Sequence, residues 1–445
     1  MDFYNADLHI HSPHSIAVSK NLDLDSMAHT SKMKGLSVLG TGDITQPDWR
    51  NYLERNLEKK GGVYRYKNIS FIIQTELEDE ESIHHVVLLP TIESGAELMK
   101  KIDPHTKNVT GNYAGRPHVN VPPAEILDIV HDVGGVCGPA HAFTPFKAIF
   151  RANKFSNLIE CYGEMADKVD FLELGLSADT DLADRLACLS EITFLSNSDA
   201  HSEGPQSLGR EFNKFEIEEP SFDEIVKALK RQDARKITLN VGMEPKLGKY
   251  PMLFCRRCRK RVRLYLEENL PERFADLNFK QSLTEKYSSN DNFIYYVFKN
   301  ETDLQNFKSQ IGQGNVKCVS CEKTGKSSKI KLGVFDRIDE IADYPEPNHP
   351  DHRPPYLDII PLVEMLRVVA GVKSVKTKSV KRPYKKLIHE YGNEFEILTN
   401  NDILPKLRKD GFEKLADIIE AFHEKKVDFV PGGGGKYGKI RFDAI

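Results

Sequence analysis

Short apolar runs alternate with amphipathic stretches through the first 240 residues of this 445-residue chain, and this alternation limits the possible folds more than any other feature. Helical patterns such as Leu24–Lys34 lie between the runs, with Asp23 suited to open that helix and Gly35 to end it. The runs are Asp7–His11, Leu36–Gly40, Ile69–Gln74, His85–Leu89, Gly135–Pro139, Phe171–Leu174 and Ile192–Leu195. Strands that alternate with helices in this way predict an α/β fold, as a parallel layer or a barrel.

Histidines and acids stand at the ends of these runs. His9 and His11 have i, i+2 spacing, so both imidazoles face the same way on a strand. Asp199-Ala200-His201 repeats that spacing after the last run. Because the carboxyl ends of parallel strands meet at one face, such side chains are expected to converge. The candidate metal ligands are His9, His11, Asp43, Glu76, His85, His141, Asp199 and His201.

This set of candidates exceeds what one tetrahedral ion needs, so we expect two or three divalent ions. Mixed imidazole and carboxylate ligands suit Zn²⁺, Mn²⁺ or Fe²⁺ better than Ca²⁺. Clustered ions can bind the oxygens of a phosphate ester and lower the pKa of a bound water. The pattern therefore favours phosphoester hydrolysis, with amide hydrolysis as an alternative from the same ligands.

Two close cysteine pairs, Cys255/Cys258 and Cys318/Cys321, predict a second kind of metal site. Two C-x₂-C turns can complete a tetrahedral shell of four thiolates around one structural zinc ion. The 59 residues between Cys258 and Cys318 exceed the usual spacing, so we expect the insert to fold as its own hairpin. A redox role for the cysteines is the alternative.

Charge and proline content divide the chain. Residues 1–250 carry 27 Lys+Arg against 38 Asp+Glu, a net charge of −11, and residues 251–445 carry 35 against 28, a net of +7. Lys246–Pro251 and the proline-rich Tyr344–Pro355 are the predicted boundaries. We therefore expect a metal-dependent catalytic domain over 1–245, a small Cys₄ zinc-binding domain over 250–335, and a mostly helical, basic domain over 345–445.

Residues 367–386 hold eight basic residues and no acidic one. Such a run is suited to clamp a phosphate backbone, and the candidates are Lys381, Arg382, Lys385 and Lys386. The alternative is a solvated flexible loop, because Pro383 and Tyr384 interrupt the run. The glycine-rich stretch Gly432–Lys439 could bring backbone N–H groups close to a phosphate, although it lacks the spacing of an NTP-binding loop.

The metal motifs resemble those of the PHP (polymerase and histidinol phosphatase) superfamily. The resemblance rests on Asp7–Ser12, Thr41–Asp43, Glu76, His141 and Ser198–His201, which occur in the right order within about the first 240 residues. It implies a distorted (β/α)₇ barrel whose multinuclear site holds Zn, Mn, Mg or Fe ions, with Glu76 bridging two of them.

Two ligand positions remain open in this comparison of motifs. PHP domains usually have Asp-His in the second motif, whereas this chain has Asp43-Ile44. Either Asp43 takes over as a ligand or one metal position is weakened. Of His84 and His85, the sequence favours His85, because it directly precedes the apolar residues Val86–Leu89.

The order of the whole chain resembles the endonuclease Q family of PHP proteins. The similarity extends over Asp7–Lys20, Leu172–Asp179, the two cysteine pairs, Gly333–Arg337 and Pro431–Ile440. It implies a DNA repair endonuclease that cuts 5′ of a deaminated base (uracil, hypoxanthine, xanthine) or an abasic site. It further implies 3′-hydroxyl and 5′-phosphate products, and damaged DNA as the partner.

The resemblance also suggests residue roles. Asp199, His201 and Glu76 would be catalytic, the first two holding an ion near the attacking water. An enzyme that inspects a base must take it out of the stack. Ser177 and Asp179 are candidates for the base pocket, although Asp179 is equally suited to cap a following helix.

Two other functions stay open. A PHP-type phosphatase or 3′–5′ exonuclease would keep the metal site but ignore base identity, and a non-catalytic zinc-containing DNA-binding protein would keep only the scaffold. No apolar run approaches the roughly 18 residues of a membrane span, and Met1–His14 lacks the pattern of a secretory signal. We therefore expect a cytoplasmic, nucleoid-associated protein without membrane contact, with a sliding clamp as a further partner.

Overall fold

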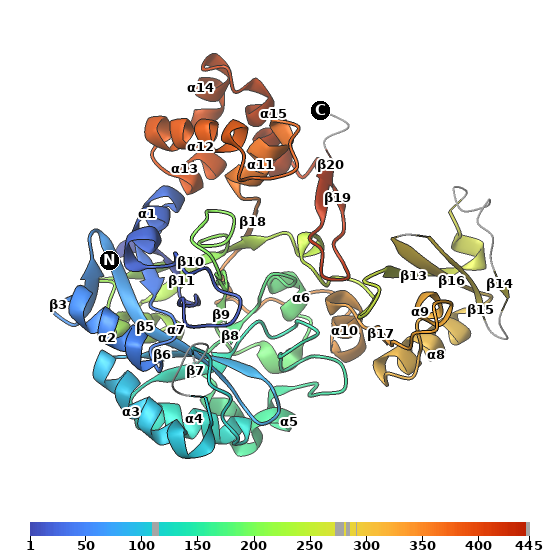
Figure 1. Ribbon diagram of the computed structural model, residues 1–445, viewed down its shortest axis with the longest axis horizontal. Helices are drawn as coiled ribbons and strands as arrows, with labels where there is room; N and C mark the ends of the chain where they lie inside the picture. The colour runs from blue at the N-terminus through green and yellow to red at the C-terminus, as the bar shows by residue number, and fades with distance from the viewer. Residues whose placement is uncertain (109–114, 272–279, 282–284, 291, 442–445) are drawn as a thin grey trace.

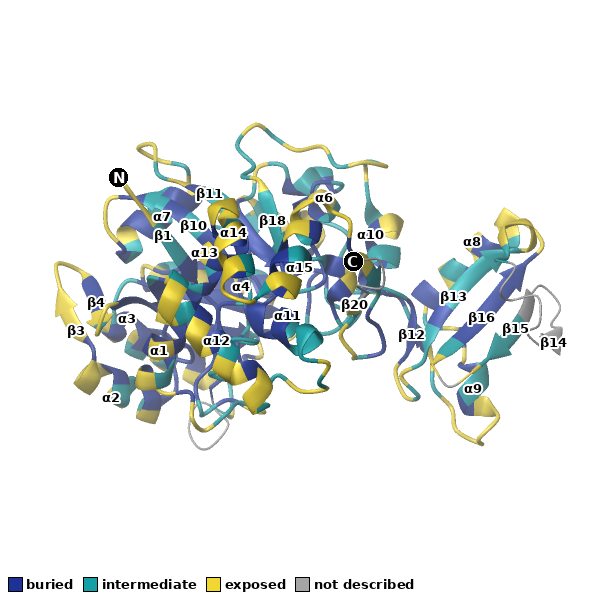
Figure 2. Cartoon of the chain, turned by 90° about the horizontal axis from the view of Figure 1, so that it is seen from above, coloured by how far each residue is buried: buried dark blue, intermediate teal, exposed yellow. Residues whose placement is uncertain are grey.

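The computed structural model describes the chain except residues 109–114, 272–279, 282–284, 291 and 442–445 (Figure 1). Its main body is a mixed α/β region, and a mostly helical region of C-terminal residues lies beside it. A smaller lobe with its own sheet projects from the main body (Figure 2). Among the described residues, no helix is long and apolar enough to cross a membrane.

The main sheet has the order β18-β11-β10-β1-β2-β5-β4-β3, and β6 extends it from β5 to β7. Its strands are β1 (Asp2–Asp7), β2 (Val38–Gly40), β3 (Glu58–Lys60), β4 (Val63–Tyr66), β5 (Ile69–Glu78), β6 (His84–Leu89), β7 (Val136–Pro139), β10 (Phe212–Ile217), β11 (Lys236–Met243) and β18 (Tyr356–Ile359). β1, β2 and β5 are parallel, whereas β6 is antiparallel to both β5 and β7, and β10 to both β1 and β11. The sheet is therefore mixed rather than wholly parallel.

A separate parallel pair, β8 (Leu172–Glu173) and β9 (Phe194–Leu195), lies between the ends of β7 and β1. The backbone N–H of Ala142 donates to Glu173 O at 2.8 Å, and that of His11 donates to Ala200 O at 3.1 Å. These bonds join the segments after β7 and β1 to the short pair. They bring segments from both ends of the first 201 residues together.

Helices pack around this sheet: α1 (Leu24–Lys34), α2 (Pro47–Asn56), α3 (Ile92–Ile102), α4 (Pro123–Asp132), α5 (Leu158–Tyr162), α6 (Thr180–Ala183) and α7 (Phe222–Leu229). The predicted helix Leu24–Lys34 is confirmed with the same bounds. The Asp23 carboxylate accepts from the backbone N–H of Ser26, and Gly35 ends the helix at φ 87°.

The smaller lobe contains both cysteine pairs. Its sheet has the order β14-β15-β16-β13-β12-β17. Its elements are β12 (Phe254–Cys255), β13 (Arg261–Leu266), β14 (Lys280–Gln281), β15 (Glu285–Ser289), β16 (Phe293–Phe298), β17 (Ile330–Lys331), α8 (Glu301–Gly312) and α9 (Val319–Glu322). Ile294, Phe298 and Phe307 pack with three of the cysteines in one apolar cluster. We call this lobe the Cys₄ module.

The chain then returns to the main body before it forms the C-terminal helices. α10 (Val334–Ile341) buries Val334 and Ile338 in the apolar core of the main body, and β18 pairs with β11. β18 lies within the segment predicted as a C-terminal domain, yet it extends the main sheet. The remaining elements are α11 (Leu362–Val369), α12 (Lys378–Tyr391), α13 (Glu394–Thr399), α14 (Leu404–Lys409), α15 (Glu413–His423), β19 (Asp428–Val430) and β20 (Lys439–Arg441).

Candidate metal centre

Two groups of three side chains each bring possible ligand atoms within 4.8 Å of one another. The first group is His9, His11 and Asp199, and the second is Glu76, His84 and His141. They come from β5, from the start of β6, and from the segments that follow β1, β7 and β9. The expected convergence of histidines and acids from distant segments is thus observed.

In the first group, Asp199 lies closest to His11. Asp199 Oδ1 is 3.1 Å from His11 Nε2 and 3.9 Å from His9 Nε2. Both imidazoles are fully buried, whereas the Asp199 side chain is 30% exposed. The carboxylate therefore stands at the open side of the group, where a substrate can approach.

Glu76 joins the two groups. Its Oε1 is 2.9 Å from His84 Nδ1, 3.3 Å from His141 Nε2 and 3.6 Å from His9 Nε2. Its Oε2 is 3.5 Å from His11 Nε2. One buried carboxylate thus faces ligand atoms of both groups, which is the arrangement expected of a bridging ligand.

Two atoms of this centre lack hydrogen-bond partners. Among the described residues, no group makes a hydrogen bond of suitable geometry to the buried atoms His9 Nε2 and Glu76 Oε1. Leaving buried polar groups unpaired costs about 1–3 kcal/mol each. Imidazole nitrogen and carboxylate oxygen are also ligands of Zn²⁺, Mn²⁺ and Fe²⁺. The residues present therefore fit divalent cations.

The shifted pKa values of residues in the centre also indicate a site suited to a cation. Burial alone would lower the pKa of His9, but the nearby carboxylates, Glu173 foremost, raise it to about 9. Burial alone would raise the pKa of Glu76, but His84 and Arg116 hold it well below its usual range. Protonated imidazoles therefore balance the carboxylates in the metal-free protein, and a bound cation would take over that charge.

Three residues of the centre have strained backbone. Asp43, His141 and Asp199 have φ of 40°, 32° and 47°, in the left-handed region that favours glycine. Each such residue costs on the order of 1–3 kcal/mol and persists only where the surrounding structure holds it. The strain directs side chains from the turns after β2, β7 and β9 toward the centre.

Asp43 lies behind His11 and belongs to neither ligand group. Its Oδ1 is 3.1 Å from His11 Nδ1, and its Oδ2 accepts hydrogen bonds from the Ser12 and Ser15 hydroxyls at 2.6 and 2.9 Å. This arrangement orients the His11 ring. Ile44, which replaces the usual histidine, is buried in the core.

The choice of His85 over His84 was wrong about which ring faces the centre. His85 Nε2 lies 2.8 Å from Asp79 Oδ2, and its Nδ1 lies 3.3 Å from Tyr162 Oη, in the core. Successive residues of a strand point to opposite faces, so only one of the two histidines can face the ligand groups. His84 is that residue, and proximity to the apolar run did not reveal it.

His201 lies at the rim of the centre. Its ring centroid is 4.6 Å from that of His11, and its Nδ1 is 2.9 Å from the backbone oxygen of Asp199. Burial outweighs the Asp199 charge and lowers the pKa of His201, which favours the neutral ring that a metal ligand needs. Its metal and catalytic roles stay predictions.

Sequence reasoning missed two supporting residues. Glu173 Oε2 is 2.8 Å from His9 Nδ1, and its Oε1 accepts from the His141 backbone N–H at 3.1 Å. An acid inside an apolar run was the available signal. Arg116 Nη1 donates to Glu76 Oε2 at 3.0 Å and has no sequence signal of its own. Outer partners of this kind fix ligand orientation.

The four cysteines of the Cys₄ module converge as predicted. Sγ of Cys255 and Cys321 are 3.7 Å apart, as are those of Cys258 and Cys318, and all four lie within 4.8 Å. A tetrahedron with Zn–S bonds of about 2.3 Å has sulfurs about 3.8 Å apart. A disulfide would need about 2.05 Å. The Cys318 thiol also lowers the pKa of Cys255 to about 4, which favours a thiolate.

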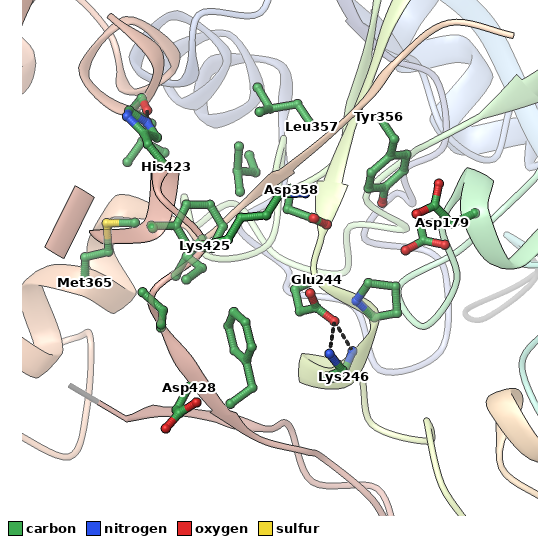
Figure 3. A pocket seen from close by; sticks show the side chains of 18 of the residues that line it. Asp179, Glu244, Lys246, Tyr356, Leu357, Asp358, Met365, His423, Lys425 and Asp428 are labelled. Carbon is green, nitrogen blue, oxygen red and sulfur yellow. Dashed lines mark hydrogen bonds and ion pairs between the residues drawn. The ribbon is translucent and has the colours of Figure 1, made fainter. Parts of the chain in front are cut away.

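The predicted base-pocket residues, Ser177 and Asp179, belong to neither ligand group. Asp179 caps α6 by accepting from the Leu182 N–H at 2.8 Å, and buried Ser177 packs against Gly248. Asp179 also lines a cavity of about 850 Å³ with Glu244 and Asp358 (Figure 3). No residue of the two ligand groups lines this cavity. A base-reading role stays a prediction for both residues.

The basic run is helical rather than a loop over α12, which continues through Pro383. Tyr384 is buried and donates to Glu394 Oε2 at 2.9 Å, which anchors the helix. The four predicted contact residues lie on this helix and are all exposed: Lys381, Arg382, Lys385 and Lys386. Their contact with DNA stays a prediction.

Comparison with known proteins adds independent findings. A family model described as "PHP-associated" matches residues 179–234, and one described as the MJ0043 C-terminal domain matches residues 361–426. The chain is 38% identical over 315 residues to the uncharacterized protein MJ0043 of Methanocaldococcus jannaschii, a match that covers 69% of this chain but only 32% of that protein. The chain thus spans about a third of that relative. It is 29% identical to the uncharacterized protein YqxK of Bacillus subtilis over 98% of both chains.

Two solved structures are similar over almost the whole chain. The lesion-specific endonuclease PfuEndoQ of Pyrococcus furiosus matches with a TM-score of 0.80 and 35% identity, over 99% of this chain and 95% of that one. Endonuclease Q in complex with a 27-mer duplex, which has an abasic lesion at the active site, matches with a TM-score of 0.81 and 35% identity, over 99% and 96%. The fold and the paired ligand groups define a PHP-type protein with a candidate multinuclear metal centre. More narrowly, the chain belongs to the endonuclease Q family.

Proposed function

We propose that this protein is a metal-dependent DNA repair endonuclease. It would hydrolyse the phosphodiester 5′ of a deaminated base (uracil, hypoxanthine or xanthine) or an abasic site, leaving 3′-hydroxyl and 5′-phosphate ends. The observation that carries the proposal is the position of Glu76 between two ligand groups. It occurs in a chain that is 35% identical to a lesion-specific endonuclease over 95% of that protein.

The proposed barrel has seven strands, in the order β1, β2, β5, β6, β7, β8 and β9. Ladders join β1 to β2, β2 to β5, β5 to β6 and β6 to β7, and β8 pairs with β9. Backbone bonds after β7 and β1 connect the short pair to both sides. This order supports the distorted (β/α)₇ barrel, which would form the domain over residues 1–245.

The two ligand groups would hold divalent ions, and Glu76 would be shared between them. When bound, such ions supply a Lewis acid for phosphate oxygens and lower the pKa of a water nucleophile. Asp199, the most open carboxylate of the groups, faces the substrate side. Arg116 is 28% exposed, so its guanidinium can bind a phosphate oxygen while it holds Glu76 in place.

The four thiolates would hold one zinc ion, which stabilises the Cys₄ module rather than taking part in chemistry. The basic side chains of α12 would contact the phosphate backbone of the duplex. Contact with a sliding clamp remains a prediction from the resemblance alone.

The decisive experiment is a cleavage assay with Mn²⁺ or Mg²⁺. Duplexes with a single uracil, hypoxanthine, xanthine or abasic site are compared with the undamaged duplex, and product ends are mapped on a sequencing gel. Cutting 5′ of a lesion, with the undamaged duplex left intact, is expected. Equal digestion of all duplexes would instead identify a nuclease without lesion specificity, and binding without cutting would identify a non-catalytic DNA-binding protein.

A further inference from the structure

The glycine-rich loop over residues 432–438 is firmly attached to the rest of the protein. The backbone N–H of Gly432 donates to Lys246 O at 2.7 Å, and that of Gly438 donates to Leu247 O at 2.9 Å. These amides are therefore occupied within the protein. The loop is a packed structural element rather than an open cradle for a phosphate.

One side of the loop rests on the Cys₄ module. Gly434 has φ 62°, and a Cβ there would lie only 1.9 Å from the backbone oxygen of Arg259. Arg259 directly follows Cys258. Arg261 Nη1 donates to Pro431 O at 2.7 Å. Glycine is therefore required at the point where the loop meets the cysteine turn.

The other side of the loop reaches the metal centre through a single arginine. Arg210 Nη1 donates to Tyr437 Oη at 2.7 Å. The same guanidinium donates from Nε and Nη2 to the backbone oxygen of Ser198 at 3.1 and 2.8 Å. Ser198 precedes Asp199, whose φ of 47° must be held by its surroundings.

Packing does not explain why a tyrosine stands at this position. Tyr437 is 40% exposed, so the burial of its ring is only partial. Lys249 Nζ lies 4.8 Å from the ring centroid and the Arg210 guanidinium carbon lies 5.9 Å from it, and a phenylalanine ring would keep both cation–π contacts. The hydroxyl group therefore has a specific partner in Arg210, beyond what a phenyl ring would offer.

We propose that Tyr437 is a positioning residue of the metal centre, which acts through Arg210 on the backbone of Asp199. The seating of the C-terminal loop against the Cys₄ module thereby becomes a condition for full activity. Without the hydroxyl group, the Arg210 guanidinium loses one of the partners that orient it. Its two hydrogen bonds to the backbone oxygen of Ser198 then become weaker. The inference rests on the proposed nuclease function for its kinetic readout, but not for its metal-binding readout.

The test compares Tyr437→Phe with Tyr391→Phe. The control removes another tyrosine hydroxyl of the C-terminal region, which donates to Asp410 at 2.6 Å. Activity is measured on a duplex with one abasic site, and Mn²⁺ affinity is measured by calorimetry on zinc-loaded protein without DNA. For Tyr437→Phe we expect kcat to fall about tenfold, equivalent to about 1.4 kcal/mol, with KM within about twofold. Mn²⁺ affinity should fall about fivefold, and the control should match the wild type.

Unchanged kcat and unchanged Mn²⁺ affinity would overturn the inference. A rise in KM alone would also overturn it, because Tyr437 would then be a DNA contact. If the wild type cuts neither the abasic duplex nor a duplex with a deaminated base, the proposed function fails, while the Mn²⁺ comparison still decides the inference. A double variant with Arg210→Lys adds a second criterion: Tyr437→Phe should cause no further loss in the Arg210→Lys background, and a fully additive loss would contradict the route through Arg210.

Discussion

The metal centre and the Cys₄ module are built in opposite ways. The metal centre takes its ligand candidates from separate segments between His9 and Asp199, and two of its residues in the ligand groups have left-handed backbone. The Cys₄ module takes its ligands from two short turns on one small sheet with its own apolar cluster. The first set of candidates comes from segments spread over the whole domain, whereas all four cysteines belong to one lobe.

The two sites also differ in whether their candidate ligand atoms already have partners. Within the part of the chain that the structure describes, His9 Nε2 and Glu76 Oε1 have no hydrogen-bond partner, and Asp199 is partly exposed. The sulfurs of the cysteines, in contrast, face one another in a closed set of four. An open centre with unpaired ligands suits a site that binds substrate, and a closed shell suits a site that stabilises the fold.

Substitution of Asp199 should cause the largest loss of cleavage activity. A small loss would contradict the contrast between an open metal centre and a closed Cys₄ site. Asp199→Ala removes the ligand candidate on the substrate side, so cleavage of an abasic duplex should fall by at least about 1,000-fold. Binding of the same duplex, measured by fluorescence anisotropy, should change by less than about threefold. Normal turnover by this variant would exclude the proposed metal centre.

Substitution of Cys318 should affect the other site instead. Cys318→Ser should remove one zinc ion per chain by elemental analysis, because three thiolates hold zinc much less tightly. The module should lose structure, and duplex binding should weaken about tenfold or more. Cys188→Ser, which changes a cysteine outside the cluster, is the matched control. Unchanged zinc content in Cys318→Ser would contradict a structural zinc site.

Substitutions of the neighbouring residues His84 and His85 test which of the two is a metal ligand. His84→Ala should weaken Mn²⁺ binding about 10- to 100-fold, measured by calorimetry. His85→Ala should leave Mn²⁺ affinity unchanged but destabilise the fold by about 1–3 kcal/mol, because it removes the imidazole that pairs with buried Asp79. The reverse pattern in calorimetry and urea unfolding would restore His85 as the ligand.

Substitution of the four basic residues on α12 should weaken DNA binding by a smaller amount, which depends on the salt concentration. Replacing Lys381, Arg382, Lys385 and Lys386 together by Gln should weaken duplex binding about tenfold at low salt. The salt slope of log K should also decrease by about 0.9 for each phosphate that the variant no longer neutralises. The control is Lys406→Gln with Lys409→Gln, which changes exposed lysines of α14. Equal losses of affinity in the α12 and α14 variants would mean that the four residues of α12 do not contact DNA specifically.

The smallest effect concerns pH. Nearby carboxylates overcome burial and raise the pKa of His9 to about 9 in the metal-free protein, against about 6.5 when unfolded. The stability from this proton is fully present below about pH 6.5 and is lost as pH rises through about 9. Calorimetric Tm of metal-free protein should therefore fall over this window, and the increase in Tm on adding Mn²⁺ should grow. A Tm gain that shrinks with pH would contradict the assigned electrostatics.

Several parts of both sites were predictable because they depend on local rules. The i, i+2 spacing of His9 and His11 puts both rings on one face of an extended segment, and each C-x₂-C turn needs only a few residues to present two thiolates. The capped helix Leu24–Lys34 was likewise found with its correct bounds. The roles of Asp43 and His84 depend on which face of a strand or turn meets the centre, and no local pattern carries that information.

By itself, the sequence determined the class of fold, the types of candidate ligand and the family resemblance, because residue type and short-range periodicity are properties of the chain alone. Only the tertiary structure decided that Glu76 lies between two ligand groups, that Glu173 supports His9, and that the C-terminal loop contacts Arg210. These contacts join residues far apart in the chain. Their distances depend on how the strands pair and pack, and spacing in the sequence does not specify that.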